Sequence, residues 1–183
     1  MKRKITWLAL ALICVAIFLA SIGSVGAYMR KQTEVKENVF VASVVDCAVE
    51  EIFTYNRKEK ITVKNTGNID AYIRLRFVTY WIDANGEILF EASPSLEVNY
   101  DKSIWTEVDD IYYYNKPVSP QQMTEDLLAG SSVIPLRDEG EGDNRKRQVV
   151  EVFAEAIQSE PQDAMKESWG VTINNGTITK ITN

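Results

Sequence analysis

The stretch KITVKNTGNIDAYIRLRFVTYW, Lys60 to Trp81, contains two runs of alternating apolar residues joined by a turn sequence. In the first run, Ile61 and Val63 alternate with polar residues, which is typical of a half-buried β-strand. The following NTGN (65–68) has turn composition, and its glycine and second asparagine suit backbone positions with positive φ. The stretch therefore predicts two core strands whose register is fixed by the turn between them.

The second run divides its side chains between two faces. The apolar face carries Ala71, Ile73, Leu75, Phe77 and Trp81, and the opposite face carries Asp70, Tyr72, Arg74 and Arg76. A long strand with one buried and one wetter face explains this division. We expect the two arginines to pair with acidic neighbours, each exposed pair contributing at most about 1 kcal/mol.

Similar alternation recurs along most of the chain. Strand candidates are ENVFVASVVDCAVEEIFTY (37–55), EILF (87–90), SLEVNY (95–100), SIWTEV (103–108), IYYYNKPV (111–118), the segment after Thr124 in MTEDLLAGSSVIPL (123–136), VVEVFAEAIQ (149–158) and a hairpin in VTINNGTITKIT (171–182). One short helix is predicted between Pro161 and Gly170. About eight to eleven short strands with regular turns predict an all-β fold, an antiparallel β-sandwich of jelly-roll or immunoglobulin-like arrangement.

Two segments differ from this simple alternation. Between Val39 and Val45 both faces of the expected strand are apolar, which indicates burial on both sides. RDEGEGDNRKR (137–147) is polar and charged, and we expect it to form a mobile acidic loop.

The first 27 residues have the composition of a signal peptide. Three cationic residues, Lys2 to Lys4, precede the uncharged apolar run Ile5–Ala20, and Val25-x-Ala27 fits a cleavage pattern between Ala27 and Tyr28. An uncleaved membrane anchor is the alternative, because the apolar run is nearly long enough to cross a bilayer of about 30 Å. Cleavage would leave 17 Lys and Arg against 26 Asp and Glu, a net charge of −9. This balance disfavours nucleic acid and anionic membrane surfaces as partners, and a membrane is expected only for the precursor.

The residues that usually carry catalysis are scarce. The sequence contains no histidine, which excludes histidine triads, histidine bases and most zinc sites. Cys47 lies in an expected strand and is predicted to be a buried structural residue. The acidic residues at 50–51, 109–110 and 139–143 match no calcium-loop spacing, and Ser131-Ser132 has no nucleophile motif around it. We expect no enzyme activity, no metal and no cofactor.

Exposed aromatic side chains are a possible binding feature. In IYYYN (111–115), alternation sends Tyr113 to the face opposite Tyr112 and Tyr114. Tyr112, Tyr114 and Trp105 are therefore candidates for a surface contact with a polysaccharide or a protein partner. Packing inside the fold is the alternative, because tyrosine is favoured in strands.

Four motifs in order along the chain resemble one known family. They are GSVGAYMRKQTEVKENVF (23–40), ITVKNTGNIDAYIRLRF (61–77), DDIYYYNKPVSPQQMT (109–124) and VEVFAEAIQ followed by AMKESWG (150–158 and 164–170). Together they resemble the TasA/camelysin-like family of exported Gram-positive bacterial proteins, whose precursors are cut by a SipW-type signal peptidase. The chain departs from the family pattern at Ser119-Pro120-Gln121, where the glycine expected after the proline is missing.

The resemblance implies a secreted jelly-roll protein of the cell surface or extracellular biofilm matrix, non-catalytic and assembling or decorating fibres. In the family's fibres the segment after the cleavage site inserts as a donor strand into the next subunit. The matching segment here runs from Tyr28 to about Val45, with Asn38, Val39, Phe40, Val41 and Ala42 as the candidate donor strand within the N-terminal segment 28–47. The sandwich domain would then span residues 48–183, and the partners would be other copies or sibling fibre proteins. An ordinary first strand of the chain's own domain is the alternative. Metallopeptidase activity, attributed to some camelysin-like members, is not expected without histidine.

Overall fold

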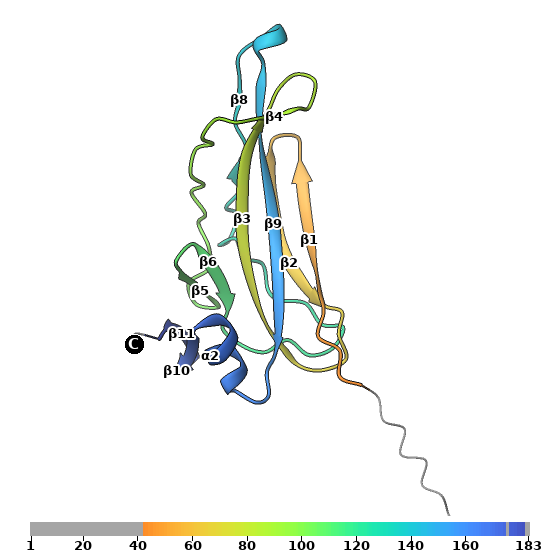
Figure 1. The fold of residues 1–183 in the computed structure, drawn as a ribbon, viewed down its shortest axis with the longest axis vertical. Helices are drawn as coiled ribbons and strands as arrows, with labels where there is room; N and C mark the ends of the chain where they lie inside the picture. The colour runs from red at the N-terminus through yellow and green to blue at the C-terminus, as the bar shows by residue number, and fades with distance from the viewer. Residues whose placement is uncertain (1–41, 175, 182–183) are drawn as a thin grey trace, which may run out of the picture. The chain divides into compact units, whose positions relative to one another are not determined.

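The computed structural model describes residues 42–174 and 176–181. The expected signal peptide, the cleavage site at Ala27 and Tyr28, and residues 38–41 of the candidate donor strand lie outside these ranges. Within them, no helix has the length and apolar character needed to cross a membrane. The described residues form antiparallel sheets and one short α-helix, which confirms the predicted all-β sandwich (Figure 1).

Two sheets face each other. The small sheet has the order β1-β2-β7, and the large sheet has the order β5-β6-β3-β9-β8, with β4 paired to β3. The strands of the small sheet are β1 (Cys47–Thr54), β2 (Arg57–Asn65) and β7 (Ile134–Pro135). Those of the large sheet are β3 (Ala71–Ile82), β4 (Ile88–Leu89), β5 (Trp105–Val108), β6 (Ile111–Tyr114), β8 (Asp138–Glu139) and β9 (Lys146–Gln158).

The main core lies between these sheets. It is built from apolar side chains of β2, β3, β5, β6, β9 and the loops beside them: Ile61, Val63, Ile73, Leu75, Trp105, Tyr114, Val118, Leu127, Leu128, Ile134, Leu136 and Val150. The predicted inward faces of β2 and β3 are therefore confirmed. In β9, Val150 is buried, and Val152 and Ala154 pack against the core.

A second apolar cluster lies on the outer face of the large sheet. Helix α2 (Asp163–Trp169) and the hairpin of β10 (Val171–Asn174) and β11 (Thr177–Lys180) cover Tyr72 and Tyr113 there, using Met165, Val171 and Ile178 (Figure 1). The helix ends at Gly170, whose left-handed φ of 66° turns the chain into β10, as predicted from this glycine. The expectation that Tyr72 lies on a wetter face is wrong, because α2 and the β10–β11 hairpin pack over that face of β3.

β1 is more exposed than its sequence suggests. Cys47 and Val49 pack against the core. Ile52 and Phe53, on either side of a β-bulge, are 51% and 54% exposed. Val44 and Val45, expected to be buried on both sides, are 51% and 36% exposed and precede the strand. The prediction of two-sided burial is therefore wrong where the structure describes it, because β1 is the outer strand of its sheet.

Three other segments differ from the prediction. SLEVNY (95–100) contains only an isolated bridge between Tyr100 and Leu128, and residues 124–133 form neither a strand nor a helix. Segment 137–147, expected to be an irregular acidic loop, contains β8, the 3-10 helix η1 (Gly142–Asn144) and the start of β9. An ion pair between Arg145 and Asp138, with Nη2 and Oδ2 2.6 Å apart, ties the two sides of this connection together.

The irregular segment 121–128 completes the free side of β2. The amides of Thr124 and Leu127 donate to the carbonyls of Val63 and Ile61, each at 2.9 Å. In return, the Val63 amide donates to Thr124 Oγ1 at 3.0 Å, and the Ile61 amide donates to Asp126 Oδ1 at 3.0 Å. Side chains thus replace a regular strand, which alternation in the sequence cannot reveal.

Leu127→Ala tests whether this irregular segment is part of the core. Leu127 is fully buried, so the substitution should lower the free energy of unfolding by about 2–5 kcal/mol. Val133→Ala, in the same stretch at 39% exposure, is the control and should cost less than about 1 kcal/mol. Urea unfolding of the two variants measures both values, and equal losses would contradict the assignment.

Candidate functional site

The turn Asn65–Asn68 holds the segment Ala42–Asp46, which leads into β1. The amides of Thr66 and Gly67 donate to the Asp46 carbonyl at 3.0 and 3.2 Å, and the Asn68 amide donates to the Val44 carbonyl at 3.0 Å. The Asn68 side chain adds two bonds: Oδ1 accepts the Val44 amide at 2.7 Å, and Nδ2 donates to the Ala42 carbonyl at 2.8 Å. We call this arrangement the exit clamp, because it fixes Ala42–Asp46, the first residues that the structure describes, against the turn.

The turn itself is anchored from inside. Asn65 is fully buried, and its Oδ1 accepts the Gly67 amide at 2.9 Å. Its Nδ2 donates to the carbonyls of Ile69 and Val118 at 2.8 and 2.7 Å, so every side-chain hydrogen is used. The buried asparagine therefore fixes the turn against two separate parts of the fold.

Gly67 is required for a different reason than expected. Neither Gly67 nor Asn68 has positive φ, so that prediction is wrong. A Cβ added at Gly67 would overlap the Val44 carbonyl oxygen far inside contact distance. Glycine is needed there because the backbone of Val44–Asp46 lies too close to the turn for any side chain at position 67.

Of the candidate donor strand, only Ala42 lies among the described residues. It is exposed, precedes β1 and contributes its carbonyl to the exit clamp. From the sequence, NTGN predicts only a turn between two core strands. The contact with Ala42–Asp46 could not be predicted, because the Asn68 side chain bonds to backbone groups that are distant in the sequence.

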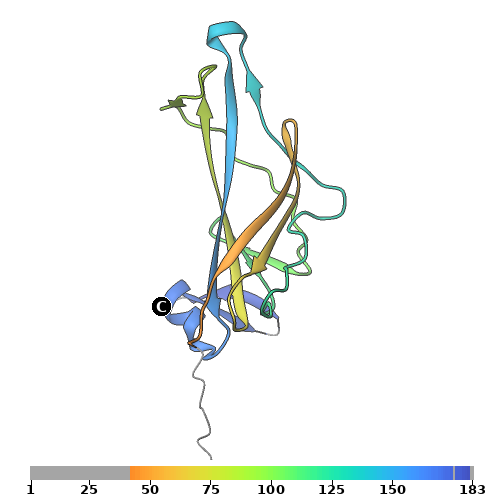
Figure 2. The ribbon, with the colours of Figure 1, turned by 90° about the vertical axis from the view of Figure 1, so that its right-hand side faces the viewer.

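Two long strands have unpaired edges on the same side of the sandwich. β1 pairs only with β2, and β9 pairs with β3 along its length but with β8 only at Lys146 and Arg147. β1 and β9 lie beside each other, as both views show (Figures 1 and 2). The described part of the chain thus leaves backbone donors and acceptors of both strands free on this side.

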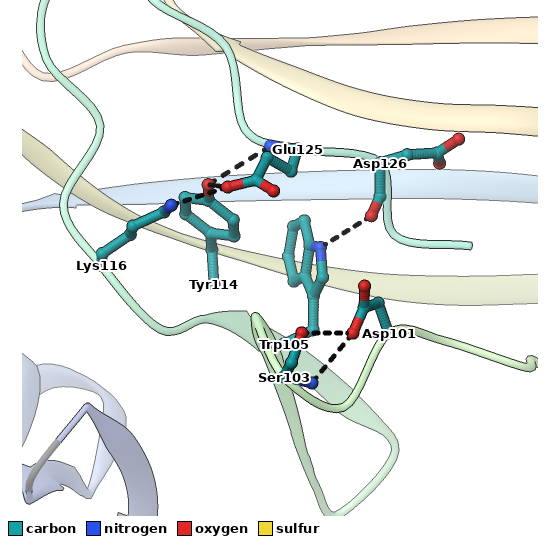
Figure 3. A network of polar contacts seen from close by, with 7 residues as sticks. All are labelled: Asp101, Ser103, Trp105, Tyr114, Lys116, Glu125 and Asp126. Carbon is teal, nitrogen blue, oxygen red and sulfur yellow. Dashed lines mark hydrogen bonds and ion pairs between the residues drawn. The ribbon is translucent and has the colours of Figure 1, made fainter. Parts of the chain in front are cut away.

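Tyr112, Tyr114 and Trp105 do not form an exposed aromatic surface. Trp105 and Tyr114 are 1% and 3% exposed and pack in the main core (Figure 3). The Trp105 indole donates to the Asp126 carbonyl at 3.2 Å, and the Tyr114 hydroxyl donates to Glu125 Oε1 at 3.3 Å. The prediction of a surface contact is therefore wrong for these two residues, because residues 125–128 cover them and both rings belong to the main core.

Tyr112 is also a packing residue. Its ring meets Phe77 and Tyr100 edge-on, with centroids 5.5 and 5.2 Å apart. Burial raises the pKa of its hydroxyl to about 12. The alternation that sends Tyr113 to the opposite face is confirmed, but both faces are covered.

The polar groups around this aromatic pair hold the loop in place. Lys116 Nζ lies 2.6 Å from Glu125 Oε1, and this hydrogen bond lowers the pKa of the Glu125 carboxyl and raises the pKa of Lys116 (Figure 3). Asp101 Oδ1 accepts the Ser103 amide and hydroxyl at 2.9 and 2.6 Å, which lowers the pKa of Asp101. All these carboxylates have structural partners.

The acidic pairs singled out in the sequence also have structural roles. Asp109 and Asp110 form the two-residue turn between β5 and β6, with φ of 54° and 61°, and aspartate tolerates this left-handed backbone. Asp109 additionally pairs with Lys180. No group of three or more metal-ligating side chains is arranged to hold an ion among the residues that the structure describes.

Cys47 is half-buried at the start of β1 and packs against the core. Burial, assisted by the charge of Asp46, raises the pKa of its thiol to about 11. A thiol with so little thiolate at neutral pH is a poor nucleophile.

Comparisons with protein-family models, with characterised proteins and with solved structures find no match to this chain. The resemblance to the TasA/camelysin-like family therefore stays a prediction that rests on the motifs quoted above.

Asn68→Ala and Asn68→Asp separate the two side-chain bonds of the exit clamp. Asn68→Ala removes both bonds and should lower the free energy of unfolding by about 1–2 kcal/mol, with faster hydrogen exchange at the Val44 amide. Asn68→Asp keeps an acceptor for Val44 but loses the donor to Ala42, so the Val44 amide should stay protected. Residue-resolved hydrogen exchange distinguishes the two variants, and unchanged exchange in Asn68→Ala would refute the clamp.

Cys47 should react slowly with thiol reagents in the folded protein. Raising a thiol pKa from its model value of 9.0 to about 11 lowers the thiolate fraction at pH 8 by about 100-fold. Iodoacetamide labelling, read by mass spectrometry on the peptide containing Cys47, should be correspondingly slower than in urea and should accelerate as the pH approaches 11. Equal rates in folded and unfolded protein would contradict this.

Proposed function

We propose that this chain is an exported, non-catalytic structural protein of the bacterial cell surface or biofilm matrix that assembles or decorates fibres by β-strand addition. The observation that carries the proposal is the pair of unpaired edges of β1 and β9 among the described residues, together with the clamp that holds Ala42–Asp46. The donor is the segment before Ala42, and the acceptor is this edge on another copy or a sibling protein.

The exposed side chains of the edge support acceptance of a strand. Soluble monomers usually protect long strand edges with lysine, proline or a covering loop. β1 instead presents Ile52 and Phe53, and β9 presents Phe153, which is 40% exposed. An added strand would bury this apolar surface while it satisfies the free backbone groups.

The exit clamp supports donation. A donor segment has to leave its own domain at a fixed point, so that it cannot fold back along its own edge. Asn68 and Gly67 bind the chain as far as Ala42, immediately after the predicted donor residues 38–41. The polar sequence YMRKQTEVKEN (28–38) would serve as the tether between the cleavage site and the donor strand.

Export, cleavage by a SipW-type peptidase and a matrix location follow from the signal-like N-terminus and the family resemblance, and belong to the same proposal. The lack of histidine in the sequence and the structural roles of the described carboxylates support a non-catalytic protein. The alternative of a polysaccharide-binding or surface-protein-binding module no longer has support from Tyr112, Tyr114 and Trp105, which are packed inside the fold.

Deletion of residues 28–38 should abolish self-association, because it removes the tether and the first donor position. Light scattering after size-exclusion chromatography and electron microscopy measure the loss. A mature protein, beginning at Tyr28, that stays strictly monomeric at high concentration would refute strand addition.

Ile52→Lys and Ile88→Lys form a matched pair that tests the acceptor edge. Both isoleucines are exposed, at 51% and 57%, but Ile52 lies on β1 and Ile88 on the two-residue strand β4. A lysine on a strand edge blocks pairing, so Ile52→Lys should reduce the oligomer fraction several-fold and Ile88→Lys should leave it unchanged. Equal effects of the two variants would place the acceptor elsewhere.

A further inference from the structure

A cavity of about 360 Å³ lies at the end of β1 opposite the exit clamp. Its walls are the β1–β2 turn, the segment from Leu136 to Asp138, and the first residues of β9. Figure 2 shows that the β1–β2 hairpin diverges from β9 toward this end. The volume falls within the range of about 300–1,000 Å³ that is usual for small-ligand pockets.

The cavity concentrates positive charge in an acidic protein. Its lining includes Lys58, Arg137, Arg145 and Arg147, against the single carboxylate of Asp138. Arg145 already binds that carboxylate through two hydrogen bonds, of 2.9 Å from Nε and 2.6 Å from Nη2, and these lower the pKa of Asp138. The remaining cations of the cavity therefore outnumber its acids.

Arg137 and Arg147 differ from the other arginines of the described residues. Arg57, Arg74 and Arg145 form ion pairs, and Arg76 lies over the Phe153 ring with its guanidinium 5.0 Å from the centroid. Within residues 42–174 and 176–181, Arg137 and Arg147 form no ion pair within 4.0 Å and have no ring partner, while the charge of Arg147 helps Arg145 to lower the pKa of Asp138. Two guanidinium groups, each able to bind a carboxylate with two parallel hydrogen bonds, thus remain available at the cavity.

The buried ammonium group of Lys58 is a second, independent observation that favours an anionic ligand. Its side chain is 6% exposed, and Nζ lies 2.5 Å from Glu51 Oε2 and 5.8 Å from the Phe53 ring centroid. An ammonium group carries three N–H donors, and the hydrogen bond to Glu51 uses one of them. A buried ammonium with unused donors at a cavity suits an anionic group that enters it.

Aromatic rings stand at the mouth of the cavity. Tyr55 is 90% exposed and Phe53 is 54% exposed, while Leu136 and Val150 form buried apolar lining. Tyr55 has φ of 54°, a left-handed conformation usual for glycine or asparagine and costly for a tyrosine. The turn thus keeps an exposed ring at a position where the backbone alone favours a smaller residue.

We propose that this cavity binds a carboxylate-bearing sugar, such as a uronic acid residue of an acidic polysaccharide. Arg137 and Arg147 bind the carboxylate, Lys58 lies beside it, and the rings of Tyr55 and Phe53 pack against the apolar face of the sugar. A compact cavity with rings at its mouth fits a cyclic ligand better than an extended acidic peptide. The negative charge of the rest of the protein is screened beyond about 8 Å at physiological ionic strength, so the local cations dominate.

This proposal does not depend on strand addition: Phe53 is the one residue that serves in both, and the cations that bind the carboxylate, the tether and the exit clamp are separate. A monomeric protein could still bind the sugar, and a fibre-forming protein could fail to bind it. The binding assay and the oligomerisation assay therefore test separate statements.

Tetragalacturonate is the probe, titrated calorimetrically into the full-length chain. We expect saturable binding that weakens with added salt. The double variant Arg137→Gln, Arg147→Gln should lose affinity by about tenfold or more, because hydrogen bonds to charged groups are the stronger kind. Arg57→Gln is the matched control: Arg57 is exposed, pairs with Glu59 and does not line the cavity, so affinity should be unchanged. No binding by the unmodified protein, or equal losses in the two variants, would overturn the proposal.

Tyr55→Asn separates sugar packing from folding. Asparagine tolerates the left-handed backbone, so the melting temperature should stay the same or rise, while the affinity for tetragalacturonate should fall several-fold. Two further ligands complete the test. The fully methyl-esterified tetramer and tetraglutamate should both bind much more weakly. Equal binding of the ester would exclude carboxylate recognition, and equal binding of tetraglutamate would make an acidic peptide the occupant, so that either result would overturn the proposal.

Discussion

The antiparallel pairing of β3 with β9 is the interaction on which the rest of the structure depends. Every residue from Ala71 to Ile82 has a partner on β9 between Gln158 and Arg147. This ladder sends one set of side chains into the sandwich core and the other toward α2 and the β10–β11 hairpin. It also places Arg147 at the end of the sheet where the cavity lies. On the outer face it brings Arg74 beside Glu155, and the two form an ion pair. The Arg74 guanidinium carbon there lies 4.6 Å from the centroid of the Trp169 ring. A one-residue slip would exchange the two faces and destroy both clusters.

The strand edges on the two sides of the sandwich differ in how far their backbone groups are hydrogen-bonded. On the far side of β2, segment 121–128 supplies backbone and side-chain hydrogen bonds, so that strand has partners on both sides. On the other side of the sandwich, β1 and most of β9 have no strand beyond them in the described residues. Among the described residues, a long irregular segment thus closes one edge, and no segment closes the other. The proposed strand addition would use this second edge.

Local patterns in the sequence were sufficient for the long core strands and for the end of the helix. Alternation located β2, β3 and β9, because each has a face buried by the opposite sheet, and the glycine at position 170 located the end of the helix. Alternation failed for residues 124–133, where Leu127 and Leu128 reach the core from irregular backbone. It also failed to tell exposed from buried tyrosines, because burial of Tyr113 depends on α2, more than 40 residues later in the sequence. Long-range packing of this kind leaves no periodic signal.

The candidate sites were hidden for the same reason. NTGN had the composition of a turn, and its second role depends on a segment about 20 residues earlier that only the folded chain brings beside it. The cavity combines Tyr55 from one hairpin with Arg137 and Arg147 from segments some 80 to 90 residues later. In the sequence these arginines belong to RDEGEGDNRKR, whose interspersed charges predict a mobile, solvated loop. Asp138 forms its ion pair with Arg145, so that Arg137 and Arg147 have no ion pair among the described residues. The binding role proposed for this segment therefore rests on which charges are paired, a property of the fold and not of composition.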